Sequence, residues 1–196
     1  MAKGSNDLIL RDRLQFETNT QGDISLVYGR IDLSDYVSIP ENKGLAIKEI
    51  RFQFRDPDND NSWPLWMNEE DAAQFPADRA SQANIGCFAT TTAYENARDV
   101  GIASPNVLSI YERVSVVWTQ TGSENFFFEE RHFGTPDLHP DGYDVVTDLL
   151  IGVYGNNLQN NVLVDSTLEL DVMVIAEPKK ITQKDLTQML AQAQDV

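Results

Sequence analysis

The sequence has few of the residue types that most often carry chemistry. It contains one cysteine and two histidines in 196 residues, which excludes an intramolecular disulfide and leaves few ligands for a histidine-rich metal site. Cys87 lies in the apolar run 85–89, where a free thiol behaves as a small core residue. The sequence motifs of serine hydrolases, P-loop enzymes and dinucleotide-binding proteins do not occur. We therefore expect no catalysis and no cofactor, apart from the calcium considered below.

Basic residues are also scarce. The chain has 15 Lys and Arg residues against 31 Asp and Glu residues, which gives a formal net charge of -16. Such an acidic protein repels phosphate backbones and anionic lipid, and its only adjacent basic pair is Lys179-Lys180. We therefore expect no direct binding of DNA or RNA.

Long apolar runs are missing as well. No segment approaches the roughly 20 apolar residues that a membrane-spanning helix needs. The first residues contain no apolar stretch of the kind found in secretory signals, so we expect synthesis in the cytosol without secretion. At 196 residues and 41% hydrophobic, the chain can bury one sizeable core.

The chain is rich in alternation at a period of two, which is typical of β-strands. The longest example is 162–176, whose apolar face consists of Val162, Val164, Leu168, Leu170, Val172, Val174 and Ala176. Its other face changes from polar to apolar at Met173 and Ile175. This pattern predicts a central strand that is covered on both sides in its second half and ends at Pro178.

Shorter alternating segments predict the remaining strands. Asp12 interrupts the apolar side of the first strand and indicates an edge position, and a change of phase near Lys48 indicates a β-bulge in the third. The predicted strands before the last one are 8–16, 24–33, 45–55, 84–93, 108–118, 126–133 and 145–154. About eight strands with little helix predict an all-β fold, an antiparallel two-sheet β-sandwich of jelly-roll type.

The hairpin 108–133 carries an unusual density of aromatic residues. Trp118 continues an apolar strand face, so we interpret it as a core residue. Phe126, Phe127 and Phe128 are consecutive, and neighbouring residues of a strand point to opposite faces. At least one of the three should therefore point away from the main core and meet another element or another subunit.

Two segments are predicted to be helical. Asn68 can cap a short helix in the 56–84 excursion. Residues 179–196 are predicted to form a C-terminal helical extension to a sandwich domain over 1–178, because Thr182 and Asp185 have capping-box spacing. The apolar stripe of this helix consists of Leu186, Met189, Leu190 and Ala193. So short a helix is marginal alone and must dock on its own sandwich or on a neighbouring subunit.

One acidic run has partial calcium-loop spacing. Asp56, Asp58 and Asp60 repeat the first three ligand positions of an EF-hand loop, but the glycine of the sharp turn and the bidentate glutamate are missing. A solvated acidic loop is the preferred interpretation. The alternative is a weak calcium site completed by Glu69, Glu70 or a neighbouring chain.

The two histidines invite a second metal hypothesis. His132, Asp137 and His139 could supply two imidazoles and a carboxylate, but Pro136 and Pro140 make their segment turn-rich. Proximity in sequence does not provide the convergent geometry of a metal site. An ordinary loop is therefore the preferred interpretation.

The order of these parts resembles the single jelly-roll capsid proteins of small or medium icosahedral viruses. The resemblance lies in the short strands, the long excursion between Arg55 and Asn84, the hairpin 108–133 and the last strand 162–176. It implies a structural virion protein, made in the host cytoplasm, that assembles in many copies into a shell. The candidate assembly residues are Leu186, Met189, Leu190, Trp63 and Trp66.

The chain departs from this family at its beginning. Capsid proteins of this type that package single-stranded genomes often have a basic N-terminal arm, whereas residues 1–22 contain only Lys3, Arg11 and Arg13. This departure implies that another virion protein or an inner membrane handles the charge of the genome.

Two other functions fit the same architecture. A β-sandwich module that binds carbohydrate or another surface ligand could use Trp63, Trp66 and Trp118 as a stacking platform. An enzyme with an unfamiliar site on the same scaffold ranks third, because catalytic groups can converge from distant parts of a sequence.

Overall fold

A computed structural model describes residues 7–64, 66–68, 80–104, 106–120, 123–134 and 141–194. The helix predicted after Asn68 lies outside these residues, as do Glu69, Glu70, Asp137 and His139.

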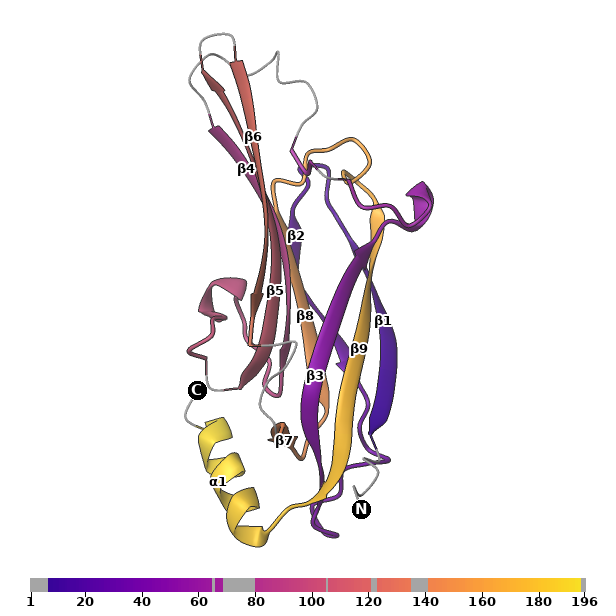
Figure 1. The fold of residues 1–196 in the computed structure, drawn as a ribbon, viewed down its shortest axis with the longest axis vertical. Helices are drawn as coiled ribbons and strands as arrows, with labels where there is room; N and C mark the ends of the chain where they lie inside the picture. Colours follow the sequence, from indigo (N-terminus) through magenta and orange to yellow (C-terminus); the bar gives the residue numbers. More distant parts are fainter. Residues whose placement is uncertain are drawn as a thin grey trace, which may run out of the picture.

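The chain forms two antiparallel sheets that pack face to face (Figure 1). The four-stranded sheet has the order β1 (Leu8–Glu17), β9 (Thr167–Lys180), β3 (Lys43–Arg55) and β7 (Tyr143–Val145). The five-stranded sheet has the order β2 (Ile24–Ile31), β8 (Leu149–Asn156), β4 (Ala80–Thr90), β5 (Val107–Gln120) and β6 (Ser123–Phe133). The described helices are two 3-10 turns, η1 (Pro57–Asn59) and η3 (Ala97–Asp99), and α1 (Gln183–Gln194).

The connections between the sheets are those of a jelly roll. Strands β1 to β4 alternate between the two sheets, and β7 to β9 do so again, which is the pattern of a sandwich built from two Greek keys. Strand β6 is an additional strand at the end of the five-stranded sheet. The predicted fold class is therefore confirmed.

Strand β9 is central, as its length and alternation predict. It pairs with β1 on one side and with β3 on the other. The side chains that face the opposite sheet are at most 3% exposed: Leu168, Leu170, Val172, Val174 and Ala176. Because these positions share one face of the strand, β9 forms the centre of the core.

Both ends of β9 differ from the prediction. Residues 161–165 form a turn, in which Leu163 is buried and Val162 is exposed, and Asp165 has a φ of 50°. The strand also continues past Pro178, which lies opposite Leu45. A proline is tolerated there because the pairing of β1 with β9 begins at Ala176, so β9 has no described partner strand on that side beyond this residue.

Two predicted irregularities are confirmed. Strand β1 is at the edge of its sheet, and the register between β3 and β9 shifts between Ile47 and Glu49. The shift bends β3 and explains the change of phase in its sequence.

The core prediction for Trp118 is wrong. Tyr111, Ser115 and Val117 lie on the inner face of β5, and all three are buried. Trp118 lies on the other face, which is covered near Ile110 by Tyr94 and the loop around it. At Trp118 this cover has ended, and the indole is 39% exposed.

Candidate assembly surfaces

Three strands project from the sandwich. Strands β4, β5 and β6 continue together beyond the end of the four-stranded sheet, at the end of the molecule opposite α1 (Figure 1). We call residues 80–83, 115–118 and 125–128 the arm. Because the four-stranded sheet ends before the arm, the inner face of the arm is covered by the excursion loop, under which Ala83, Ser115 and Val117 are buried.

The arm exposes aromatic residues on both faces. Phe127 lies opposite Val116 and shares the outer face with Trp118, whereas Phe126 lies opposite Val117 and points to the inner face. Both phenylalanines are 46% exposed. Phe127 therefore points away from the main core, as the run of three phenylalanines predicts.

The inner face of the arm meets the excursion loop. The ring centroids of Trp66 and Phe126 are 4.8 Å apart, and Trp66 is half-buried. Trp63 packs deeper, with its ring centroid 5.3 Å from that of Phe54 in the core. Trp63 thus folds the loop onto its own sandwich, whereas Trp66 and Phe126 form a partly exposed pair at the surface.

An arginine whose side chain is 13% exposed completes this junction. The guanidinium carbon of Arg113 lies 5.8 Å from the ring centroid of Trp63 and 5.1 Å from that of Phe128. Its Nε lies 3.2 Å from Oε1 of Glu130 on β6. Aromatic faces and a carboxylate both stabilise a cation, so this cluster ties β6 to β5 and to the loop. The sequence does not indicate this role, because an arginine in a strand is ordinarily expected to point into solvent.

Polar side chains fasten the same loop, which the sequence also does not reveal. Asn68 is buried, and its Oδ1 accepts a 2.5 Å hydrogen bond from the hydroxyl of Ser115. Its Nδ2 donates to the carbonyl of Ser81, and the backbone N–H of Met67 donates to the Ser115 hydroxyl. Asn68 therefore links the loop to β4 and β5.

The acidic run after β3 has one structural role. Asp56 is buried and caps η1, since its Oδ1 accepts from the backbone N–H of Asp58. Asp58 and Asp60 are exposed. No group of three His, Cys, Asp or Glu side chains among the described residues is placed to hold a metal ion. A weak calcium site stays the alternative hypothesis to a solvated acidic loop.

His132 stacks on an aromatic ring. Its ring centroid lies 4.5 Å from that of Tyr111, which in turn stacks on Phe54 at 5.8 Å. Burial raises the pKa of Tyr111 above the usual tyrosine range. Of the three residues in the histidine hypothesis, the structure therefore describes His132, an exposed imidazole that stacks on the edge of the aromatic core.

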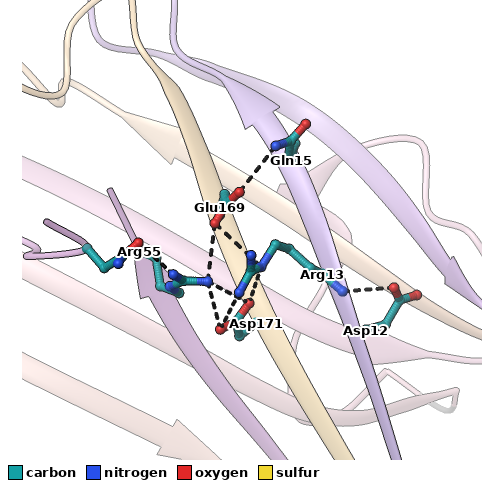
Figure 2. Close-up of polar contacts among 7 residues, drawn as sticks. Asp12, Arg13, Gln15, Arg55, Glu169 and Asp171 are labelled. Carbon is teal, nitrogen blue, oxygen red and sulfur yellow. Dashed lines mark hydrogen bonds and ion pairs between the residues drawn. The ribbon is translucent and has the colours of Figure 1, made fainter. Parts of the chain in front are cut away.

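Charged residues join three strands on the outer face of the four-stranded sheet (Figure 2). Arg13 on β1 and Arg55 on β3 flank Glu169 and Asp171 on β9. Arg55 Nη1 lies 3.3 Å from Glu169 Oε2 and 3.2 Å from Asp171 Oδ2. Arg13 Nε lies 2.6 Å from Asp171 Oδ1 and 3.4 Å from Glu169 Oε2. The side-chain amide of Gln15 donates to Glu169 Oε1 over 3.2 Å.

This network of charged residues stabilises the four-stranded sheet. Glu169 is only 6% exposed although it is on the outer face, because the two arginines cover it. The hydrogen bond to Asp171 raises the pKa of Arg13. A hollow of about 810 Å³ lies beside the network, with Arg11, Arg51 and Met173 in its lining. Since each acid in the network has two cationic partners, the network holds β1, β9 and β3 together.

The C-terminal helix begins as predicted. The Thr182 hydroxyl accepts from the backbone N–H of Asp185 over 3.2 Å, which is the N-cap hydrogen bond of a capping box. The same hydroxyl donates to the Asp185 carboxylate over 2.6 Å. Ile181 is buried and anchors the start of the helix. Leu186 and Met189 are half-buried, and the side chain of Leu190 lies outside the described set. The apolar stripe of α1 is therefore incompletely covered.

Comparisons with known proteins do not assign this chain to a family. None of the helices formed by the described residues is long and apolar enough to cross a membrane. The sequence matches no family model, and it matches no curated protein.

Proposed function

We propose that this chain is the subunit of a self-assembling icosahedral virion shell. The jelly-roll order of its strands supports the proposal, because that architecture is recurrent in viral capsid domains. Fold alone does not decide function, so the proposal depends on where the chain exposes apolar surface.

The observation that carries the proposal is apolar exposure at the two extremities of the sandwich. At one end, the outer face of the arm presents Trp118 and Phe127 beside the half-buried Val116. Trp118 and Phe127 are diagonal neighbours in the β5–β6 register, within reach of one another. At the other end, the apolar stripe of α1 is incompletely covered, with Leu186 and Met189 half-buried. Contiguous exposed aromatic and apolar residues are typical of interfaces between proteins.

The outer face of the four-stranded sheet favours contacts at these extremities over contacts between faces. Its centre carries Arg13, Arg55, Glu169 and Asp171, whose charges are already paired within the subunit. A face of satisfied charges gains little from burial against another protein. Neighbours in the shell are therefore other copies, joined through the arm and α1. Other virion proteins or an inner membrane would meet the genome, in keeping with the net charge of -16.

Purified protein provides the direct test. Size-exclusion chromatography with light scattering should give large assemblies or defined oligomers, and negative-stain electron microscopy should show closed particles. A monomer at every concentration up to the solubility limit would contradict the proposal.

The role of α1 has its own test. Deleting 182–196 should leave a folded β-domain with altered oligomerisation, because α1 follows the last strand and does not contribute to either sheet. The double variant Leu186→Ser, Met189→Ser should act in the same direction. Its matched control is Lys184→Ser, Thr187→Ser, since both residues are exposed on the same helix. Loss of the β circular-dichroism signal on deletion would show that the helix belongs to the subunit's own core.

A carbohydrate-binding module is the second candidate, favoured by the exposure of Trp118. The three tryptophans do not form one platform, however, because Trp63 is packed on the core and Trp66 contacts the inner face of the arm. A glycan module should remain monomeric, and replacing Trp118 with Ala should abolish retention on a glycan array.

A further inference from the structure

Strand β6 is a long free edge. It is the last strand of the five-stranded sheet and pairs with β5 from Ser123 to Phe133. No strand among the described residues lies on its other side. An edge of this length presents a row of backbone groups to which another chain can hydrogen-bond, and many proteins block such edges with prolines or repelling charges.

The outer face of β6 has a self-complementary order of side chains. Four successive outward positions are Phe127, Glu129, Arg131 and Phe133, in the order aromatic, acid, base, aromatic. The two phenylalanines are 46% and 36% exposed, and the side chains of Glu129 and Arg131 are 39% and 44% exposed. Within the chain these two side chains form an ion pair, in which Arg131 Nη2 donates to Glu129 Oε2 over 2.7 Å. Both reach solvent and can turn to a charge on a neighbouring strand. When the order is reversed, acid and base exchange places and the aromatic residues remain at the ends.

We propose that β6 pairs with β6 of a second copy of this chain, antiparallel and centred on Glu130. In this register Phe127 lies opposite Phe133 of the second copy, and Glu129 lies opposite Arg131 of the second copy. Aromatic pairs and opposite charges across two strands both stabilise a sheet. A two-fold axis creates each contact twice, and the two sheets become continuous.

Other registers lose this complementarity. A two-fold axis perpendicular to the sheet keeps outer residues opposite outer residues. The residue on this axis therefore determines which residues of the two strands lie opposite one another. Centring the pair on Phe128 places Phe127 opposite Glu129, and centring it on His132 places Arg131 opposite Phe133. Among the centres from Phe128 to His132, only Glu130 pairs the charges and the aromatic rings together.

The inner face accommodates the same register. Two Glu130 side chains meet near the two-fold axis, which would be unfavourable for free carboxylates. Each is already held by Arg113 of its own chain, 3.2 Å away. Phe128 then lies opposite His132 of the second copy, as a further ring pair.

This inference deepens the proposed function, because a shell requires contacts between copies and β6 supplies one of them. A single edge contact is smaller than a typical stable interface. It should therefore be weak as an isolated dimer and gain strength within a larger assembly.

Charge exchange tests the contact. In Glu129→Arg, and separately in Arg131→Glu, like charges face each other, so each variant alone should lose self-association in sedimentation velocity. A mixture of the two variants should associate again, because each supplies the charge that the other lacks. The double variant E129R/R131E should self-associate like the unaltered chain. The matched control exchanges Glu49 and Arg51, an ion pair of the same spacing on β3 of the other sheet, and should leave association unchanged.

Cysteine pairs test the register. Mixed F127C and F133C chains should form a disulfide-linked dimer under mild oxidation. F127C alone should not, since two position-127 side chains would be roughly 20 Å apart along the strands. The native Cys87 is buried and should not compete. Equal linking by F127C alone, or failure of the mixed E129R and R131E variants to associate, would overturn the inference.

The same measurements separate this inference from the proposed function. Particles that form without a link between positions 127 and 133 would refute the β6 contact and leave the shell proposal standing. Linked dimers that never form particles would refute the shell and support the contact.

Discussion

Replacing Arg55 should cost more stability than replacing any other arginine on the outer face of the four-stranded sheet. Its side chain is 16% exposed and lies between Glu169 and Asp171, with Glu169 itself only 8% exposed at the side chain. Arg55→Met keeps most of the aliphatic stem and removes the charge. Of its partners among the described residues, Glu169 would then keep Arg13, at 3.4 Å, and the amide of Gln15.

The magnitude follows from the contacts that are lost. A hydrogen bond to a charged group contributes about 1.5–3 kcal/mol, and leaving a buried charge without any partner costs about 3–5 kcal/mol. Because Glu169 retains one arginine, we expect the free energy of unfolding to fall by about 2 kcal/mol. Urea denaturation followed by circular dichroism measures this difference at an unchanged m-value.

Two further variants test whether the loss of stability comes from the uncompensated charge of Glu169. Arg51→Met is the matched control, since the Arg51 side chain is 62% exposed and, within the described part of the chain, forms an ion pair with Glu49 alone, and pairs of exposed side chains contribute little. Adding Glu169→Gln to Arg55→Met should recover part of the loss, because the uncompensated charge disappears. Equal stabilities of the Arg55→Met and Arg51→Met variants would refute the view that this network holds the three strands together.

Two further predictions concern single residues. If the acidic run binds calcium at a subunit contact, a chelator should lower the stability of the oligomer and Asp58→Asn should reproduce that loss; identical melting with and without calcium would support the solvated loop. Cys87 is fully buried, and burial raises the pKa of its thiol, so a thiol reagent should label the folded protein only as fast as it unfolds. Labelling in native buffer at the rate of a free thiol would contradict this packing.

Much of the local structure follows from the sequence alone. The period-two alternation predicts the long strand that becomes β9, and the change of phase near Lys48 predicts the bulge in β3. The capping box at Thr182 predicts the start of α1. These features depend on neighbouring residues, whose conformational preferences and hydrogen bonds act over a few positions.

The candidate sites depend on pairings that the sequence does not specify. Arg13, Arg55 and Glu169 are far apart in the chain and meet only because β1 and β3 flank β9 in one register. The order Phe127, Glu129, Arg131, Phe133 can be read in the sequence, but it becomes a contact surface only because β6 is the outermost strand of its sheet.

The aromatic residues of β5 show most clearly what the sequence does not predict. Alternation correctly separates the face of Trp118 from the face of Tyr111, and the sequence by itself determines that these are two faces of one strand. Which face is covered was decided by the tertiary structure: Tyr111 packs on Phe54 across the sandwich, while Trp118 points away from the other sheet, beyond the loop around Tyr94 that covers the outer face near Ile110. Burial depends on elements distant in the chain, so a local pattern can predict a strand without predicting which of its faces meets the core.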